Sequence, residues 1–394
     1  MDFYNRALHL KNETVSHRRY LHQNAECGLD MPLAVKYVTD KLISYGLKPQ
    51  PCGKGVTATI GNGRPVILLR ADMDALAGKE DSGEAFACNR GNFHGCGHDM
   101  HTAMLLTAAK LLKEAENRLC GTVKLMFQPG EEILQGCANM VENGILQGPE
   151  PQCALALHVA AGNMPWGMFM YNAGGVMMNS ADNFSIKING KGGHGAYPNL
   201  AIDPINTAVH IYTALQSLAA IEADPKQICT ITIGNFHGGD TLNVIPDYAV
   251  MEGSLRTDDV NCRRQIKRRI EEVCHNIAKA FGCSAEISWL AAVPPLVCEK
   301  AFTENMVKYM QEMPSATLTA VAGMKATASE DFAVIAEKIP SAMFYLSAGF
   351  ADERGTYTAH NPKVVFNEDV LPLGAAIYAH CAVKWLEENS NKMP

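Results

Sequence analysis

The sequence has no uncharged apolar run approaching the roughly 18 residues that a membrane-spanning helix needs. Its first ten residues, MDFYNRALHL, contain no apolar core of the kind that a secretory signal peptide carries. We therefore expect no contact with a membrane and no export, and we expect a cytoplasmic protein.

An excess of positive charge is also missing. The chain has 34 Lys and Arg against 41 Asp and Glu, which gives a formal net charge of −7. Its most basic stretch, residues 263–269, is followed by Glu271 and Glu272, which is typical of a solvated helix face. Nucleic acids select strongly basic surfaces, so we expect no nucleic-acid partner.

No CxxC pair occurs among the 13 cysteines, and their number is odd. This pattern does not fit a disulfide scaffold and is typical of a reduced environment. A redox function would need thiols near positive charge or near a resolving partner, and no such spacing is present. We interpret most of the cysteines as small buried hydrophobic residues.

What is present is the composition of a folded globular protein. The hydrophobic fraction is 47% and the charged fraction is 19%, and there is no internal repeat. A chain of 394 residues exceeds the usual size of one hydrophobic core, so two domains are expected.

Continuous apolar segments alternate with helix-like segments in the first part of the chain. Strands are expected at 56–61, 66–73, 122–129 and 153–159, and helices at 101–117 and 132–147. Apolar runs of this kind belong to strands that are buried on both faces. The fold class is therefore α/β, with a mixed or parallel sheet covered by helices.

Between about residues 180 and 293 the order becomes βαββαβ, the ferredoxin-like split-βαβ arrangement. This region includes a helix expected at 260–281, with Asp258 and Asp259 before it and Gly282 after it. Later segments resume the first pattern, with helices expected at 302–313, after 329–331 and at 368–389, and a strand at 341–349. The predicted domains are residues 1–178 with 295–394, interrupted by an inserted domain at 179–294.

A dense cluster of possible metal ligands lies at residues 94–101, His-Gly-Cys-Gly-His-Asp-Met-His. Cys96 and His98 are two residues apart, and their glycine neighbours allow both side chains to face one point. Thiolate and imidazole ligands suit zinc and other late divalent ions. The alternative is a tight turn whose histidines are incidental.

Three further segments supply candidate ligands, each of which has an ordinary structural alternative. Glu131 and Glu132 follow an apolar strand, where the alternative is that they begin a helix. His158 ends another apolar strand, where a histidine is more often a core residue, and His360 lies in a loop before the last helix. Together with Cys96 and His98, these residues form a chemically coherent donor set.

Taken together, these motifs and their order resemble the M20 metallopeptidase family, in its branch of aminoacylases, hippurate hydrolases and auxin-conjugate amidohydrolases. The resemblance covers nearly the whole chain and rests on seven motifs: RADMDAL (70–76), HGCGHDMHTAMLL (94–106), FQPGEE (127–132), GKGGHGAYP (190–198), NVIPD (243–247), SEDF (329–332) and AHNPKVVFNEDVLP (359–372).

The resemblance implies a dinuclear amidohydrolase that cleaves N-acyl amino acids with two divalent ions per subunit, Zn2+ or Mn2+, with Ni2+ or Co2+ as alternatives. The implied metal ligands are Cys96, His98, Glu132, His158 and His360. Cys96 would bridge the ions, Glu131 would be the general base, and Asp72 and Asp74 would orient ligands.

For the inserted domain, the resemblance implies dimerisation, as a homodimer or a dimer of dimers. His194 would reach the active site of a partner subunit and stabilise the oxyanion there. Asn243 and Arg256 are candidates for binding the substrate carboxylate, because the Arg side chain offers a two-pronged donor. A surface salt bridge is the alternative role of Arg256.

The sequence departs from the family pattern at several positions. Ala25, Ala77 and Asn199 stand where the family commonly has proline, proline and histidine, and segment 78–93 is unusual. These changes concern loop shape and substrate choice, including the acyl pocket, and none falls on a predicted ligand. Two other functions remain open: a di- or carboxypeptidase with the same centre, and a binding protein that has lost its catalytic activity.

Overall fold

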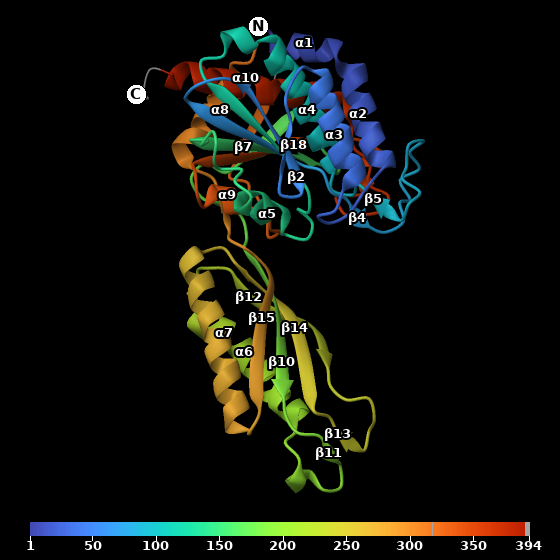
Figure 1. The fold of residues 1–394 in the computed structure, drawn as a ribbon, viewed down its shortest axis with the longest axis vertical. Coiled ribbons are helices and arrows are strands. Elements are labelled where there is room, and N and C mark those ends of the chain that lie inside the picture. Colours follow the sequence, from blue (N-terminus) through green and yellow to red (C-terminus); the bar gives the residue numbers. More distant parts are fainter. Residues whose placement is uncertain (317, 391–394) are drawn as a thin grey trace. The chain divides into compact units, whose positions relative to one another are not determined.

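A computed structural model describes residues 1–316 and 318–390, and these residues form two compact units (Figure 1). The first unit contains Met1–Met177, Val297–Lys325 and the chain from Val334 onward. The second contains Met178–Leu296 together with Ala326–Ala333. The sequence had placed the segment around residue 330 with the first domain, and the structure instead groups 326–333 with the second unit.

The first unit contains both helices and strands. Its helices are α1 (Phe3–His9), α2 (Lys11–Gln23), α3 (Pro32–Ser44), α4 (His98–Glu114), α5 (Gly136–Glu142), α8 (Lys300–Gln311) and α10 (Leu371–Asn389), with the short α9 (Ala333–Ala336) at its boundary. Its strands are β1 (Gln50–Cys52), β2 (Gly55–Gly61), β3 (Val66–Asp72), β4 (Leu76–Ala77), β5 (Asn92–Phe93), β6 (Thr122–Gln128), β7 (Cys153–Ala160), β8 (Met168–Tyr171), β17 (Thr319–Ala322) and β18 (Ser341–Ser347). Two short strands, β9 (Val176–Met178) and β16 (Leu296–Val297), lie at the limits of the two units.

Eight of the described strands of the first unit form a mixed sheet in the order β1-β2-β6-β3-β7-β18-β8-β17, and β4 pairs separately with β5. Its centre is parallel, because β3 pairs in parallel with β6 and β7, and β7 pairs in parallel with β18. Every residue of β3 and β6 is buried, as their apolar sequences predicted. The mixed α/β fold is therefore confirmed, and the carboxyl ends of four central strands share one edge of the sheet.

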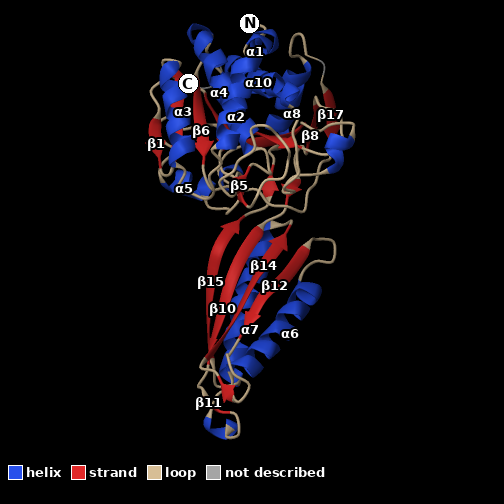
Figure 2. Ribbon diagram, turned by 90° about the vertical axis from the view of Figure 1, so that its right-hand side faces the viewer, coloured by secondary structure: helices blue, strands red, loops and turns tan. Residues whose placement is uncertain are grey.

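The second unit has a four-stranded antiparallel sheet in the order β12-β14-β10-β15, backed by two helices (Figure 2). Its elements are β10 (Ala181–Asn189), β11 (Gly193–His194), α6 (Pro204–Glu222), β12 (Cys229–His237), β13 (Val244–Ile245), β14 (Tyr248–Thr257), α7 (Val260–Ala280) and β15 (Ser284–Val293). Alternate residues of β10, including Phe184, Ile186 and Ile188, are fully buried and form the core with both helices.

Helix α7 shows how local sequence sets the limits of an element. The Asp259 side chain caps it by accepting hydrogen bonds from the backbone N–H groups of Asn261 and Cys262. Ile266, Ile270 and Cys274 recur every four residues and are fully buried. The observed α7 begins at the expected residue, 260, and ends one residue before the expected end at 281.

Two other helices differ from their predicted limits. The helix expected at 132–147 was wrong in extent, because only α5 (136–142) forms there. A tight turn precedes it, in which the Leu134 N–H donates to the Glu131 carbonyl and Leu134 has a φ of 57°. The helix expected at 101–117 begins earlier, at His98, which places the metal loop directly at its start.

A search of the described helices found none that is both long and apolar enough to cross a membrane.

A close approach of α4 and α10 offers a test of the packing. A Cβ atom added at Gly374 on α10 would lie 1.9 Å from the Met104 sulfur on α4, and Met104 is fully buried. Alanine normally stabilises a helix by about 0.5–1 kcal/mol relative to glycine. We predict instead that Gly374→Ala lowers the free energy of unfolding by about 1–3 kcal/mol, as measured by urea denaturation, because the core is overpacked.

The double variant Gly374→Ala with Met104→Ala is the matched control. Removing the Met104 side chain makes room for the new methyl group, so the double loss should be smaller than the sum of the single losses. Additive losses would show that contact with Met104 is not the cause.

Candidate metal centre

The predicted ligands gather at the carboxyl edge of the parallel strands in the first unit. His158 is near the end of β7, and Glu131 and Glu132 follow β6 after a Pro-Gly turn. Cys96 and His98 lie where the chain enters α4, and His360 lies in the loop that follows β18. Side chains at this edge of an α/β sheet commonly form its binding site.

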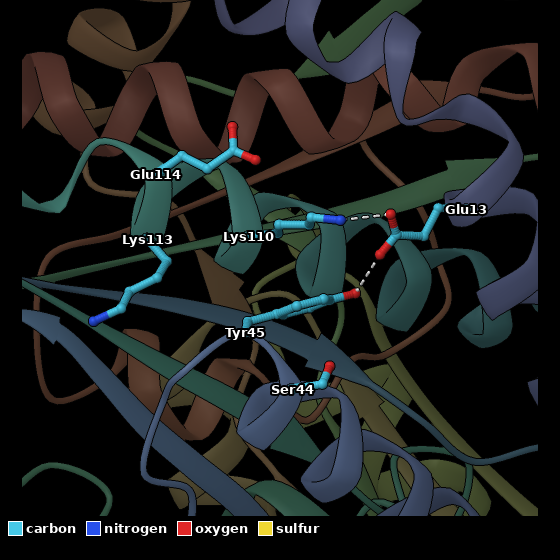
Figure 3. Close-up of a pocket in the computed structure, with 6 residues that line it drawn as sticks. All are labelled: Glu13, Ser44, Tyr45, Lys110, Lys113 and Glu114. Carbon is cyan, nitrogen blue, oxygen red and sulfur yellow. Dashed lines mark hydrogen bonds and ion pairs between the residues drawn. The ribbon is translucent and has the colours of Figure 1, made fainter.

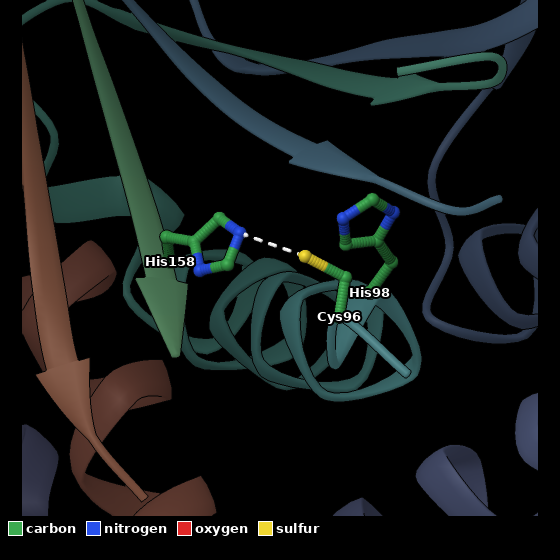
Figure 4. Close-up of side chains that lie close together, drawn as sticks. All are labelled: Cys96, His98 and His158. Carbon is green, nitrogen blue, oxygen red and sulfur yellow. Dashed lines mark hydrogen bonds between the residues drawn. The ribbon is translucent and has the colours of Figure 1, made fainter. Parts of the chain in front are cut away.

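Gly97 sets the geometry of the metal loop. It has a φ of +84°, and a Cβ atom there would lie 2.4 Å from Val159 Cγ2. This left-handed residue lies between Cys96 and the first residue of α4, His98. The turn brings the Cys96 sulfur to 3.4 Å from His158 Nε2, with His98 beside it (Figure 4). Only glycine fits this close backbone approach without strain.

Two groups of three donors share the Cys96 sulfur. Cys96, His98 and His158 form one group, and Cys96, Glu132 and His360 form the other. Within each group, the donor atoms all lie within 4.8 Å of one another. Between the groups, His98 Nε2 is 3.9 Å from Glu132 Oε1. This arrangement is suited to two neighbouring cations with one sulfur between them.

Buried polar atoms test whether a cation fits this site. Among the described residues, His98 Nε2 and Glu132 Oε1 are buried and have no hydrogen-bond partner. Such atoms are rare in folded proteins, because burying a polar group without a partner is costly. Both face the donor cluster, and a thiolate, imidazoles and a carboxylate are ligands of late divalent ions. The donor set therefore fits a pair of such ions.

Asp74 orients two of the donors at once. Its Oδ1 lies 3.3 Å from His98 Nδ1, and its Oδ2 accepts a hydrogen bond of 2.9 Å from the Glu132 backbone N–H. A carboxylate behind an imidazole fixes the ring and directs its other nitrogen toward the metal position. The contacts of Asp74 agree with the orienting role expected for the Asp72 and Asp74 region.

His101 was not predicted to contribute, yet it supports the centre from behind. Its Nε2 accepts a hydrogen bond of 2.8 Å from the Val159 N–H, so its Nδ1 carries the proton that Asp72 accepts at 2.5 Å. The Val159 carbonyl in turn accepts from His158 Nδ1 at 2.7 Å. This leaves the lone pair of His158 Nε2 directed at Cys96. The signal in the sequence was its spacing, because His98 and His101 are neighbours on one helix face.

Burial shifts the protonation of the donors. Burial lowers the pKa of His158 well below its usual value, which keeps this ring neutral and able to act as a ligand. Burial also raises the pKa of the Cys96 thiol to about 12, although the neighbouring His98 opposes the rise. Burial likewise raises the pKa of Glu132. Anionic forms of Cys96 and Glu132 therefore require positive charge nearby.

His360 is held in an unusual backbone conformation. It has a φ of 69°, which is uncommon for a residue other than glycine. Its backbone N–H donates a hydrogen bond of 2.8 Å to the Gly95 carbonyl. The same residue therefore joins its own loop to the Cys96 loop, and its Nε2 lies 3.6 Å from Glu132 Oε2.

The predicted substrate-binding residues all belong to the second unit. Two of them, His194 and Asn243, lie close together, and Arg256 lies apart from both. His194 on β11 is exposed, and the Asn243 carbonyl accepts a hydrogen bond from the next residue, Gly195, so these two positions are close. Arg256 lies near the other end of β14, where its guanidinium donates to the Ser329 hydroxyl. The residues from Tyr248 to Arg256 span about 25 Å of β14, and His194 pairs with Val244, which lies beyond the Tyr248 end of this strand.

A hollow of about 350 Å³ lies elsewhere in the first unit (Figure 3). It is lined by Glu13, Ser44, Tyr45, Lys110, Lys113 and Glu114. Its charges neutralise one another, because the Glu13 carboxylate accepts from both Lys110 and Tyr45. Nothing in this hollow resembles the donor cluster at the sheet edge.

The close approach at Gly97 yields a prediction about metal binding. In Gly97→Ala the new methyl group meets Val159, so the Cys96 and His98 donors are displaced. We expect zinc affinity, measured by calorimetric titration of protein treated with a chelator, to fall by about tenfold or more.

Gly63→Ala is the control. Gly63 also has a positive φ, 74°, but a Cβ atom there meets nothing within 4 Å. If Gly97→Ala binds zinc as tightly as Gly63→Ala does, the contact of residue 97 with Val159 does not control the positions of the donors.

Comparison with known proteins gives the family. Residues 68–384 match the family described as peptidase family M20/M25/M40. N-acetyl-L-cysteine deacetylase of Bacillus subtilis (strain 168) is 34% identical over 96% of this chain and 90% of its own length. IAA-amino acid hydrolase ILR1-like 2 of Arabidopsis thaliana is 37% identical over 95% and 85%. Hippurate hydrolase of Campylobacter jejuni is 34% identical over 96% and 98%.

Solved structures give the same result. A crystal structure from methicillin-resistant Staphylococcus aureus superimposes with a TM-score of 0.90 at 30% identity, covering 98% of this chain and all of the other. The Bacillus subtilis YXEP protein, described as a dinuclear metal binding peptidase from the M20 family, has a TM-score of 0.78 at 29% identity, with coverage of 96% and 99%. The chain belongs to peptidase family M20/M25/M40.

Proposed function

We propose that the protein hydrolyses the amide bond of N-acyl amino acids, releasing a carboxylic acid and a free amino acid, with two divalent metal ions. The observation that carries this proposal is the pair of three-donor groups that share Cys96. Relatives named as a deacetylase, an IAA-amino acid hydrolase and a hippurate hydrolase support the substrate class.

One ion would be held by Cys96, His98 and His158, and the other by Cys96, Glu132 and His360. Each set of three protein ligands leaves open positions, as catalytic sites require. Zn2+ fits the sulfur and nitrogen donors best, and Mn2+, Ni2+ or Co2+ are alternatives, because affinity depends on availability as well as ligand type.

A pair of ions supplies a water of lowered pKa and a polarised substrate carbonyl. The protein must then hold and move a proton, and Glu131 is the group for this task. It is buried, it is adjacent in sequence to Glu132, and one of its oxygens lies within 4.8 Å of donor atoms of His98 and Glu132. Glu131 would accept a proton from water and deliver it to the departing amine nitrogen.

The second unit would bind the substrate carboxylate and dimerise. Arg256 is half-buried beside the Ser329 hydroxyl, so its guanidinium is oriented, and Asn243 is the second candidate for this carboxylate. The order of strands and helices in this unit fits a ferredoxin-like dimerisation domain, and we propose a homodimer or a dimer of dimers.

The separation of His194 from Arg256 supports a site composed of two subunits. An N-acyl amino acid is about two residues long, or roughly 7 Å. About 25 Å of β14 separates Arg256 from Tyr248, and His194 lies beyond Tyr248, so His194 and Arg256 of one chain cannot both touch one such substrate. We propose that His194 of a second copy stabilises the oxyanion.

A di- or carboxypeptidase remains the second candidate, because the YXEP structure is described as a peptidase. The same ions and Glu131 would serve either reaction. Assays with acetyl, benzoyl and indoleacetyl amino acids beside dipeptides separate the two, since a peptidase would favour the dipeptides.

Glu131→Gln tests the role of the proton carrier. The amide keeps the size of the side chain but cannot accept the proton, so kcat should fall by about 10²-fold or more. Metal analysis should still find two ions per chain. Glu132→Gln is the matched control, because it should lose metal as well as activity. Near-normal turnover by Glu131→Gln would remove Glu131 from the mechanism.

Subunit complementation tests the role of His194. His194→Ala and Glu131→Gln homodimers should each be nearly inactive. After unfolding and refolding as an equal mixture, half of the dimers are mixed, and each mixed dimer has one site with both residues intact. Activity should then recover to about one quarter of the parental value. No recovery in dimers shown to be mixed, or full activity of His194→Ala alone, would contradict the composite site.

A further inference from the structure

A buried histidine outside the donor set, His22 on α2, joins two carboxylates from distant parts of the first unit. Its Nδ1 lies 2.8 Å from Asp99 Oδ2, and its Nε2 lies 2.9 Å from Glu80 Oε1. Burial alone would lower the pKa of His22, but the hydrogen bonds to Asp99 and Glu80 outweigh it and raise the pKa to about 9. Both ring nitrogens therefore donate.

Glu80 connects His22 to the unusual segment 78–93. The Glu80 side chain is only 3% exposed. Its second oxygen accepts a hydrogen bond of 2.8 Å from the Cys88 backbone N–H, and the Ser82 hydroxyl donates to the first. Phe86 packs edge-on against the His22 ring, at 5.1 Å between centroids. A single carboxylate thus ties both arms of the segment to α2.

The segment also contacts the loop that carries His360. The Asp81 backbone N–H donates a hydrogen bond of 2.9 Å to the Pro362 carbonyl, and Lys363 Nζ lies 3.5 Å from the Asp81 carboxylate. His360 itself is in a left-handed conformation, and its side chain is 56% exposed. A strained and exposed ligand depends on neighbouring backbone to keep its position.

The other half of the centre has separate support. Asp99, in the first turn of α4, also accepts from Arg18 Nε at 3.1 Å, so it keeps a charged partner without His22. His98 is held by Asp74, and His158 by its own strand and the Val159 carbonyl. Loss of His22 therefore removes the anchor of segment 78–93 and leaves the supports of His98 and His158 in place.

We propose that His22 is a positioning residue, which locks segment 78–93 through Glu80 so that this segment holds the His360 loop in its ligating position. The proposal rests on the two-ion centre of the proposed function. His22 then affects the two metal sites unequally. The affinity of the site formed by Glu132 and His360 depends on His22, and the affinity of the site formed by His98 and His158 does not.

His22→Ala, His22→Gln and Glu80→Gln test this assignment in the full-length protein. Hydrogen exchange of the chelator-treated proteins should show amides of residues 81–88 exchanging about tenfold faster than in the parent. Calorimetric titration with Zn2+ alone should show the weaker of two sites losing about 10–100-fold in affinity, with the tighter site changed less than threefold. His22→Gln keeps one donor and a similar size, so it should fold and show a smaller change in the same direction. His9→Ala, on the exposed face of α1, is the control.

A cobalt-loaded sample identifies the ion that is affected. The His360→Ala protein should lose the same site as His22→Ala, and the two Co2+ absorption spectra should match. The proposal is overturned if exchange of the segment is unchanged, if both ions weaken equally, or if the lost site matches that of His158→Ala. If the parent protein does not bind two metal ions, the proposed function fails instead. Faster hydrogen exchange in the variants would still establish that His22 anchors segment 78–93.

Discussion

Five donor side chains from distant parts of the sequence meet because the parallel strands of the first unit end at a common edge. The edge alone is not sufficient, since Cys96 must also come within reach of His158. Gly97 permits this by bringing backbone against Val159, where any side chain would collide. The register of the strands and the glycine at position 97 therefore determine whether the Cys96 thiol can belong to both groups of metal ligands.

Charge is the second constraint on this centre. Burial disfavours the anionic forms of Cys96 and Glu132 and the cationic form of His158, so positive charge nearby favours the ligating forms of Cys96 and Glu132. Asp74 fixes the orientation of the His98 ring, and Asp72 fixes that of His101. The protein thus supplies preorganised geometry, and cations supply the missing electrostatic energy.

Predictions from the sequence were most accurate for helices and strands whose limits depend on nearby residues. Strands β3 and β6 were evident from their apolar runs, and α7 from its cap and four-residue spacing. The helix expected at 132–147 was wrong because Leu134 adopts a left-handed conformation that glycine or asparagine usually takes, and this creates the turn bearing Glu131. His22 was missed because its partners are remote: Glu80 and Asp99 lie 58 and 77 residues from it. No local pattern encodes such contacts.

The two halves of the centre differ in the kind of structure that holds them. His98 begins a long helix and His158 lies in a central strand, so their positions follow from the packed core. Glu132 lies in a turn, and His360 lies in a loop with a left-handed backbone. Loops move more readily than core elements, because fewer buried contacts hold them. The buried ion pair of His22 and Glu80 ties segment 78–93 to α2, and this segment contacts the His360 loop through Asp81. In the proposed positioning role, this support compensates for the difference and offsets the cost of burying a charged histidine.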